Sequence, residues 1–257
     1  KTGHKGFEKE VEITNMNKDR LRPLFKVTII MLIISVAMVS IIIFLNSFGG
    51  GKKVKLDATK ATTTQLETPK NGQEIAIIKT NMGDMKVALY TEYAPKAVEN
   101  FVSLAKSGYY NGTYIFQDEP TVYFIGGGKN KDGSGGEKKT MDNEITANLW
   151  PFKGSLCSIG DGDTNCSGNK IMFVNSIEFT DKIKEQMKSA SKNEKLTDAF
   201  INNGGIPNFV GQYTVFAQTY EGMDVFEKIS AVTSDKNTKQ PSQDIIIESV
   251  EISTYGG

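Results

Sequence analysis

Apolar and polar residues alternate in several short runs between residues 74 and 254, which is a pattern typical of β-strands. Two of these runs, 75–79 and 85–89, are joined by TNMGD, whose glycine suits a tight turn, so this segment predicts a β-hairpin. Further strand-like runs are TVYFIGG, GSLCSI, KIMFVN, YTVFAQ and DIIIESVEI. Gly-rich loops separate these runs, as is expected between successive strands.

Two segments have the apolar period of a helix instead. In APKAVENFVSLAKSGYY, Pro95 suits the first turn of a helix and Gly108 suits its end. In GMDVFEKISA, the residues Met223, Phe226 and Ile229 fall on one face. Many short strands with only two framing helices predict an all-β fold, a closed antiparallel barrel.

The stretch 177–203 interrupts this strand-rich pattern. Its apolar residues form two helical faces among Lys and Glu, first Ile183, Met187 and Ala190, then Leu196, Ala199, Phe200 and Ile201. We expect a helical hairpin inserted into the barrel domain. It either packs on the barrel or serves as a lid or docking surface for a partner protein.

Residues 27–51 carry no charge, and their core VTIIMLIISVAMVSIIIFL is long enough to cross a hydrocarbon layer of about 30 Å as a helix. We therefore expect a cytoplasmic N-terminal tail (1–23), one transmembrane helix in the lipid bilayer (24–48), a flexible linker (49–73) and a folded domain (74–254). A buried core helix and a cleaved signal peptide fit less well, because the run is apolar on every face and no small-x-small cleavage site follows it.

Charge divides unevenly along the chain. Residues 1–72 hold 12 Lys and Arg against 6 Asp and Glu, and the remainder holds 18 against 24. An acidic folded part disfavours nucleic acid as a partner. Basic residues lie on both sides of the apolar run, so the positive-inside rule gives only a slight preference for orientation. We expect a single-pass protein of the cell membrane with its large C-terminal domain outside the cytoplasm.

Over roughly residues 74–254 the sequence resembles the cyclophilin family of peptidyl-prolyl isomerases. The matching pieces are, in order, IIKTNMGDMKVALYTEYAPKAVENFVSLAKSGYYNGTYIF, IGGG followed by DGSGGE, NEI, WPFKGSLCSIG, SGNKIMFV and VGQYTVFAQTYEGMDVFEKI. The stretch GGIPNFVGQYTVFAQTYEGMD is similar to Gram-positive bacterial members. The resemblance implies an eight-stranded barrel capped by two helices.

The resemblance also implies an activity, which is rotation about an X-Pro bond against a barrier of about 18–20 kcal/mol. The family uses an arginine whose guanidinium hydrogen-bonds the prolyl nitrogen as it becomes pyramidal. Gln117 stands at that position, and the arginines of the chain are Arg20 and Arg22, before the apolar run. A glutamine amide can donate a hydrogen bond, but it has neither the charge nor the fork of a guanidinium.

Neighbouring groove positions differ from the family as well. Val122, Tyr123 and Ile125 stand where the family has Phe-Met-x-Gln, which keeps an apolar pocket and removes a polar anchor for the substrate backbone. The family's tryptophan aligns with Asn208 and its rim histidine with Tyr213. The resemblance places the peptide-binding groove at Phe116, Val122, Tyr123, Ile125, Lys170, Met172, Asn208, Phe209 and Tyr213.

Two cysteines, Cys157 and Cys166, lie nine positions apart on the segment that forms the family's groove wall. They predict either a disulfide that pins this loop in an oxidising exterior or two separate buried thiols. His4 is the only histidine, and DGDTN lacks the later glycine and glutamate of a calcium loop. We therefore expect no metal and no cofactor.

These observations leave two functions open. The first is a prolyl isomerase homologue that acts on or binds proline-containing polypeptide outside the cytoplasm, with catalysis weak or lost. An apolar pocket that favours a twisted amide by desolvation would leave some turnover. The second is a non-enzymatic interaction subunit of a membrane protein complex.

Overall fold

The computed structural model describes residues 53–136, 140–160 and 165–257. The expected N-terminal tail (1–23) and transmembrane helix (24–48) lie outside these residues. No helix of the described part is long and apolar enough to cross a membrane. The chain divides into two units after Phe48, and the fold given below is that of the described residues of the second unit.

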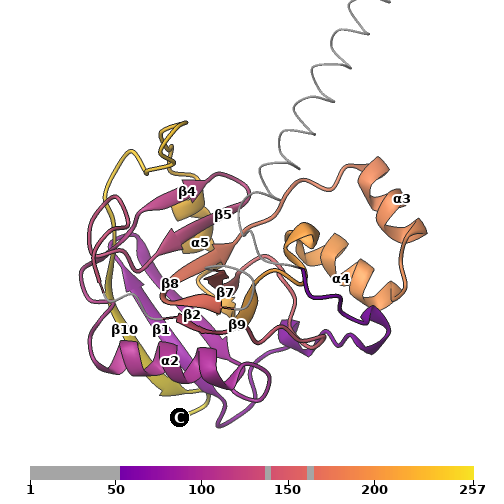
Figure 1. Cartoon of the computed structure of the whole chain (residues 1–257), viewed down its shortest axis with the longest axis horizontal. Helices are drawn as coiled ribbons and strands as arrows, with labels where there is room; N and C mark the ends of the chain where they lie inside the picture. Colours follow the sequence, from indigo (N-terminus) through magenta and orange to yellow (C-terminus); the bar gives the residue numbers. More distant parts are fainter. Residues whose placement is uncertain (1–52, 137–139, 161–164) are drawn as a thin grey trace, which may run out of the picture. The chain divides into compact units, whose positions relative to one another are not determined.

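The second unit is built on one antiparallel sheet in which β6 pairs with β8 beside the main strand order β3-β10-β1-β2-β9-β7-β8-β5-β4 (Figure 1). Its strands are β1 (Glu74–Thr80), β2 (Gly83–Leu89), β3 (Thr113–Ile115), β4 (Gln117–Glu119), β5 (Tyr123–Gly126), β6 (Thr140–Asp142), β7 (Ser155–Gly160), β8 (Asn165–Val174), β9 (Thr214–Glu221) and β10 (Ile245–Thr254). β1 and β2 form the predicted hairpin, with Thr80 opposite Gly83.

The sheet nearly closes into a barrel because the strands at its two edges, β3 and β4, follow one another directly in the chain. β3 pairs with β10, and β4 pairs with β5. Between them, Tyr114 forms an antiparallel bridge with Gly128, and the Phe116 N–H donates to the Ile125 carbonyl at 2.9 Å. This confirms the predicted antiparallel barrel, although it is nearly closed rather than closed and has ten strands in the described part where the resemblance implied eight.

Helices lie at the ends of the barrel and beside it (Figure 1). They are α2 (Pro95–Lys106), α3 (Asp181–Ser189), α4 (Glu194–Asn203) and α5 (Met223–Ser230), with the short 3-10 turns η1 (Ala58–Lys60), η2 (Thr64–Leu66) and η3 (Pro207–Phe209). α2 and α5 are the two framing helices that the sequence predicts. Pro95 begins α2, and the Glu144 carboxylate accepts from two of its first backbone N–H groups, at 3.1 and 2.9 Å.

Aromatic side chains fill the barrel. Phe124 and Phe173 stack with their ring centroids 4.6 Å apart, and Phe226 of α5 lies 4.9 Å from Phe124. On the α2 side, the ring of Phe101 lies 5.3 Å from that of Phe216. These helices therefore close the barrel with the apolar faces that their sequences predict.

The insertion 177–203 forms the predicted helical hairpin, α3 and α4, whose first turns are capped by Thr180 and Asn193. α4 helps to form a second core outside the barrel, made of Trp150, Phe152, Leu196, Ala199 and Phe200. The ring centroids of Phe152 and Phe200 are 4.5 Å apart. α3, by contrast, has no buried residue.

The segment 53–69, here called the strap, differs from the flexible linker expected over 49–73. It forms η1 and η2, and Leu56, Ala58, Ala61 and Leu66 pack against the second core. Figure 1 shows it as the indigo segment beside α4. The Gln65 side chain is 1% exposed. The hydrogen bonds of this side chain join residues 85 or more positions away, so the local sequence pattern does not predict them.

Candidate functional site

Gln117, where the resemblance implies an arginine, begins the short strand β4. Alternation along β4 puts Gln117 and Glu119 on one face and the buried Asp118 on the other. The Gln117 Nε2 donates to the Tyr123 hydroxyl at 3.0 Å. One of the two amide donors is thus already satisfied within the protein.

The groove residues on neighbouring strands share the face of Gln117. Residues directly opposite in an antiparallel sheet point to the same side. Gln117 faces Ile125, Ile125 faces Met172, and Met172 faces Cys157. Tyr123 is two positions from Ile125 and lies on the same face. The structure therefore brings Gln117 and three of the expected groove positions together on one surface of the sheet.

Phe209 covers part of this surface from the turn η3. Its ring centroid lies 6.3 Å from Tyr123 and 5.0 Å from Tyr213, in an edge-to-face arrangement with the latter. Phe209 is 1% exposed, and Val122, Tyr123, Met172 and Tyr213 are also buried. Burial raises the pKa of the Tyr123 and Tyr213 hydroxyls well above their ordinary value, so both stay neutral. The expected pocket positions thus form an aromatic and aliphatic cluster.

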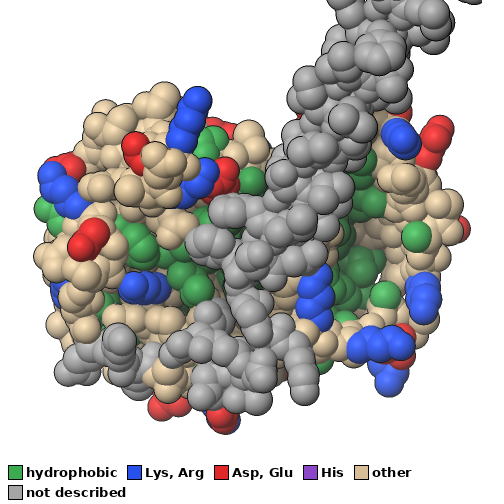
Figure 2. Space-filling model, turned by 45° about the horizontal axis from the view of Figure 1, so that its top comes forward, with side chains coloured by type: hydrophobic (Ala, Val, Ile, Leu, Met, Phe, Trp, Pro, Cys, Tyr) green, Lys and Arg blue, Asp and Glu red, His purple; other side chains and the backbone are tan. Residues whose placement is uncertain are grey.

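The remaining groove positions lie at its margin. The Lys170 Nζ lies 5.0 Å from the centroid of the Phe116 ring, a cation–π distance. Phe116 is packed so closely against the following loop that a Cβ at Gly133 would overlap its ring. Asn208, at the family's tryptophan position, is exposed. On the face shown in Figure 2, the visible Lys side chains are interspersed with Asp and Glu.

Both cysteines are free and buried, so the structure has no disulfide between Cys157 and Cys166. The register gives the reason. The Cys166 thiol lies beside the side chain of Ser158, and successive residues of a strand point to opposite faces of the sheet, so Cys157 points away from Cys166. Two cysteines whose Cβ vectors point apart cannot form a disulfide without movement of the backbone. Burial raises the pKa of Cys157 to about 12 and that of Cys166 to about 11.

Asp118 was not singled out by the sequence. It is 0% exposed, and neither carboxylate oxygen has a hydrogen-bond partner among the described residues. Desolvation, with a smaller contribution from the charge of Glu119, raises the pKa of Asp118 to about 8. Glu119 in turn pairs with Lys239 at 2.8 Å. Because the buried acid Asp118 has a raised pKa, we expect the free energy of unfolding of the barrel to depend on pH.

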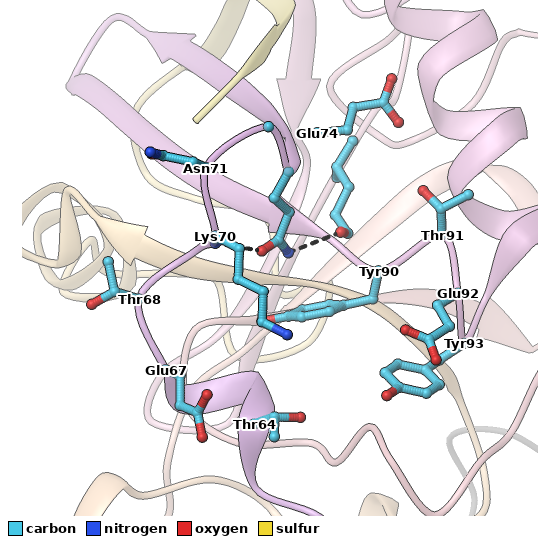
Figure 3. A pocket seen from close by; sticks show the side chains of 13 residues that line it. Thr64, Glu67, Thr68, Lys70, Asn71, Glu74, Tyr90, Thr91, Glu92 and Tyr93 are labelled. Atoms are coloured by element: carbon cyan, nitrogen blue, oxygen red, sulfur yellow. Dashed lines mark hydrogen bonds between the residues drawn. The ribbon is translucent and has the colours of Figure 1, made fainter. Parts of the chain in front are cut away.

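A cleft of about 450 Å³ lies away from the surface that carries Gln117 (Figure 3). It is lined by residues between 64 and 74, which include the end of the strap, and by residues 89–93 at and after the end of β2. Tyr90 lies in its centre, and the Gln73 amide links its walls by accepting from the Lys70 N–H at 3.0 Å and donating to the Leu89 carbonyl at 3.2 Å. The cleft shares no residue with the expected groove. No group of three His, Cys, Asp or Glu in the described part is arranged to hold a metal ion.

Comparison with known proteins defines the family. Residues 75–252 match the model of the cyclophilin type peptidyl-prolyl cis-trans isomerase family. The chain is 34% identical over 192 residues to a putative peptidyl-prolyl cis-trans isomerase of Staphylococcus saprophyticus, covering 73% of this chain and 96% of that protein. It is 30% identical to a putative bifunctional phosphatase/peptidyl-prolyl cis-trans isomerase of Streptococcus pyogenes, covering 73% of this chain and 40% of that protein.

Solved structures agree on the fold. A cyclophilin type isomerase of Cryptosporidium parvum superposes with a TM-score of 0.56 at 24% identity, over 71% of this chain and 98% of that chain. The same protein in the presence of the dipeptide Ala-Pro gives a TM-score of 0.55 over 70% of this chain. The chain belongs to the cyclophilin-type peptidyl-prolyl cis-trans isomerase family.

Proposed function

We propose that the barrel binds proline-containing polypeptide segments on the face that carries Gln117, Tyr123, Met172 and Phe209, and that it isomerises them only weakly. Membership of the isomerase family supports the substrate class. The gathering of apolar and aromatic side chains on this face supports a pocket for a prolyl ring.

The observation that carries weak catalysis is the environment of Gln117. The family's arginine supplies a charged donor that is most effective in the transition state. Gln117 is neutral, and its amide donates to the Tyr123 hydroxyl. Removal of one transition-state donor typically costs about 10²–10³ in rate, so we expect a loss of at least that size.

Nuclear magnetic resonance tests both halves of this proposal in one sample. An Ala-Ala-Pro-Phe tetrapeptide is titrated into isotope-labelled protein. We expect shifts of the Phe209 and Tyr213 resonances, together with cis/trans exchange of the peptide only marginally above the uncatalysed rate. Exchange as fast as that of an ordinary cyclophilin would contradict weak catalysis. Unshifted resonances at millimolar peptide would contradict binding.

We further propose that residues 24–48 anchor the protein in the cell membrane and that the domain acts outside the cytoplasm. The uncharged run 27–51 supports the anchor. Protease added to intact cells should remove the domain if it is outside, and full protection until lysis would contradict this orientation.

The alternative is a non-enzymatic subunit of a membrane protein complex, for which α3 is the favouring feature because none of its residues is buried in the domain. A wild-type protein that neither binds nor isomerises the tetrapeptide would favour this alternative. Co-purification of a stable membrane partner, lost when α3 is replaced by a short Gly-Ser loop, would support it further.

A further inference from the structure

The strap reaches residues 207–213, here called the rim of the proposed groove. The contact is made by Lys53 and Val54, the first residues of the strap. The Val54 N–H donates to the Gly211 carbonyl at 2.8 Å, and the Lys53 Nζ donates to the Asn208 carbonyl at 3.1 Å. These two carbonyls belong to the residues that flank Phe209 and Val210 in the chain. The strap therefore bonds the main chain of the turn that places Phe209 over the sheet.

The contact at Gly211 is a close approach of one backbone to another. Gly211 has φ +77°, and a Cβ built there would overlap the carbonyl oxygen of Val54. A residue with a side chain would be strained by this conformation and would also displace the strap. The glycine thus permits the strap to lie directly against the rim.

The middle of the strap is bound to the insertion and to the loop before β7. The Asn193 Nδ2, at the start of α4, donates to the Ala58 carbonyl at 3.0 Å, and the Thr62 N–H donates to the Ala147 carbonyl at 3.3 Å. Val210 of the rim packs against the same second core as the strap's apolar side chains. Rim, insertion and strap therefore share one packed cluster.

Gln65 anchors the other end. Its side chain accepts from the Trp150 N–H at 2.7 Å and donates to the Trp150 carbonyl and to the Gln218 Oε1, both at 2.9 Å. The Tyr90 hydroxyl, seen in the centre of Figure 3, donates to the Gln65 carbonyl at 2.8 Å. Because Gln65 is almost wholly buried, release of the strap would leave several of these polar groups without partners.

We propose that the strap is a positioning element of the polypeptide-binding site, which holds the rim 207–213 in the shape that receives the ligand. This inference rests on the proposed function. A rim that is fixed before binding loses less conformational freedom when the ligand arrives, so a docked strap strengthens binding. The helical insertion then has a role of its own, because α4 is part of the surface on which the strap is docked.

A matched pair of substitutions in the full chain isolates this effect. Val54→Pro removes the N–H that Gly211 accepts from, whereas Val54→Ala shortens the same side chain and keeps the donor. Val54 is exposed, so neither change disturbs the barrel core. Each variant is titrated with the Ala-Ala-Pro-Phe tetrapeptide, and amide hydrogen exchange is measured over 207–213.

We expect Val54→Pro to weaken binding at least about threefold relative to Val54→Ala, the effect of one ordinary hydrogen bond, and to speed amide exchange of the rim. Equal affinity and equal exchange in the two variants would overturn the proposal. Faster exchange with unchanged affinity would overturn the binding role. If the wild type does not bind the tetrapeptide, the proposed function fails with it, and unchanged exchange would separately refute the strap's hold on the rim.

The fluorescence of Trp150, the only tryptophan of the chain, reports strap docking independently. Its backbone bonds Gln65, and its side chain is buried in the second core. Gln65→Ala is expected to shift its emission to longer wavelength and to weaken tetrapeptide binding together. The control is Asn81→Ala, which also removes two side-chain bonds to main-chain groups but lies on the exposed β1–β2 turn, away from the strap. If Asn81→Ala weakened binding as much as Gln65→Ala, the effect would be general loss of stability and the proposal would be wrong.

Discussion

Replacing Asp118 with asparagine should make the barrel increasingly stable relative to the wild type as the pH rises. The folded carboxyl is 0% exposed and has a raised pKa of about 8, against 3.8 for the ordinary group. For an acid with a raised folded pKa, the folded state binds the proton more tightly than the unfolded state. Its cost to stability is therefore absent below pH 3.8 and increases as the pH rises towards 8.

The size of this effect follows from the two pKa values. Each pH unit between them costs about 1.4 kcal/mol, which gives a ceiling of roughly 6 kcal/mol above pH 8. Asparagine has nearly the same shape and does not ionise. It leaves an unpaired buried amide, but that cost does not depend on pH. The change with pH in the difference in free energy of unfolding between Asp118→Asn and the wild type therefore measures the buried charge. The size of that difference at a single pH does not.

Urea unfolding followed by Trp150 fluorescence from pH 5 to 9 tests this reasoning. The free energy of unfolding of Asp118→Asn minus that of the wild type should rise up to pH 8 and then level off. Asp132→Asn is the control, because Asp132 is exposed and its hydrogen bonds to Ser134 lower its pKa, so it does not titrate in this range. A difference between Asp118→Asn and the wild type that stays constant with pH would refute a buried ionisable Asp118.

Two further predictions concern buried groups. Gln65→Ala should lower the free energy of unfolding by about 3 kcal/mol in urea titrations, because the Trp150 N–H loses its acceptor; a loss below about 0.5 kcal/mol would show that the strap is not firmly docked. Cys157 and Cys166 should react with a thiol reagent only after unfolding, since both are buried with raised pKa values, and then as two free thiols; fewer than two would indicate a disulfide.

Much of the fold could be predicted because local patterns determine it. The turn TNMGD joins two alternating runs that do pair as β1 and β2. Pro95 begins α2 as expected, and the two apolar faces of 177–203 became α3 and α4. In each case the signal and the structure it specifies lie within one short stretch of chain.

The strap and the cysteines could not be predicted in the same way. The strap is held by Gln65 and by main-chain groups that bond to residues far along the chain. The relative orientation of the cysteines depends on the register of β7 with β8, which a spacing of nine positions does not reveal. The candidate groove was located through the family resemblance, but the burial of Phe209 and the bond from Gln117 to Tyr123 required coordinates.

The proposal that catalysis is weak because residue 117 is a neutral glutamine is tested most directly by placing an arginine there. Gln117→Arg alone must compete with the Tyr123 hydroxyl for space, so the decisive variant is Gln117→Arg combined with Tyr123→Met, the residue that the family resemblance places there. The measurement is the cis/trans exchange rate of the Ala-Ala-Pro-Phe tetrapeptide at equal protein concentration. We predict that the double variant exceeds the wild type by about 10² or more. A wild type as fast as the double variant would contradict the account.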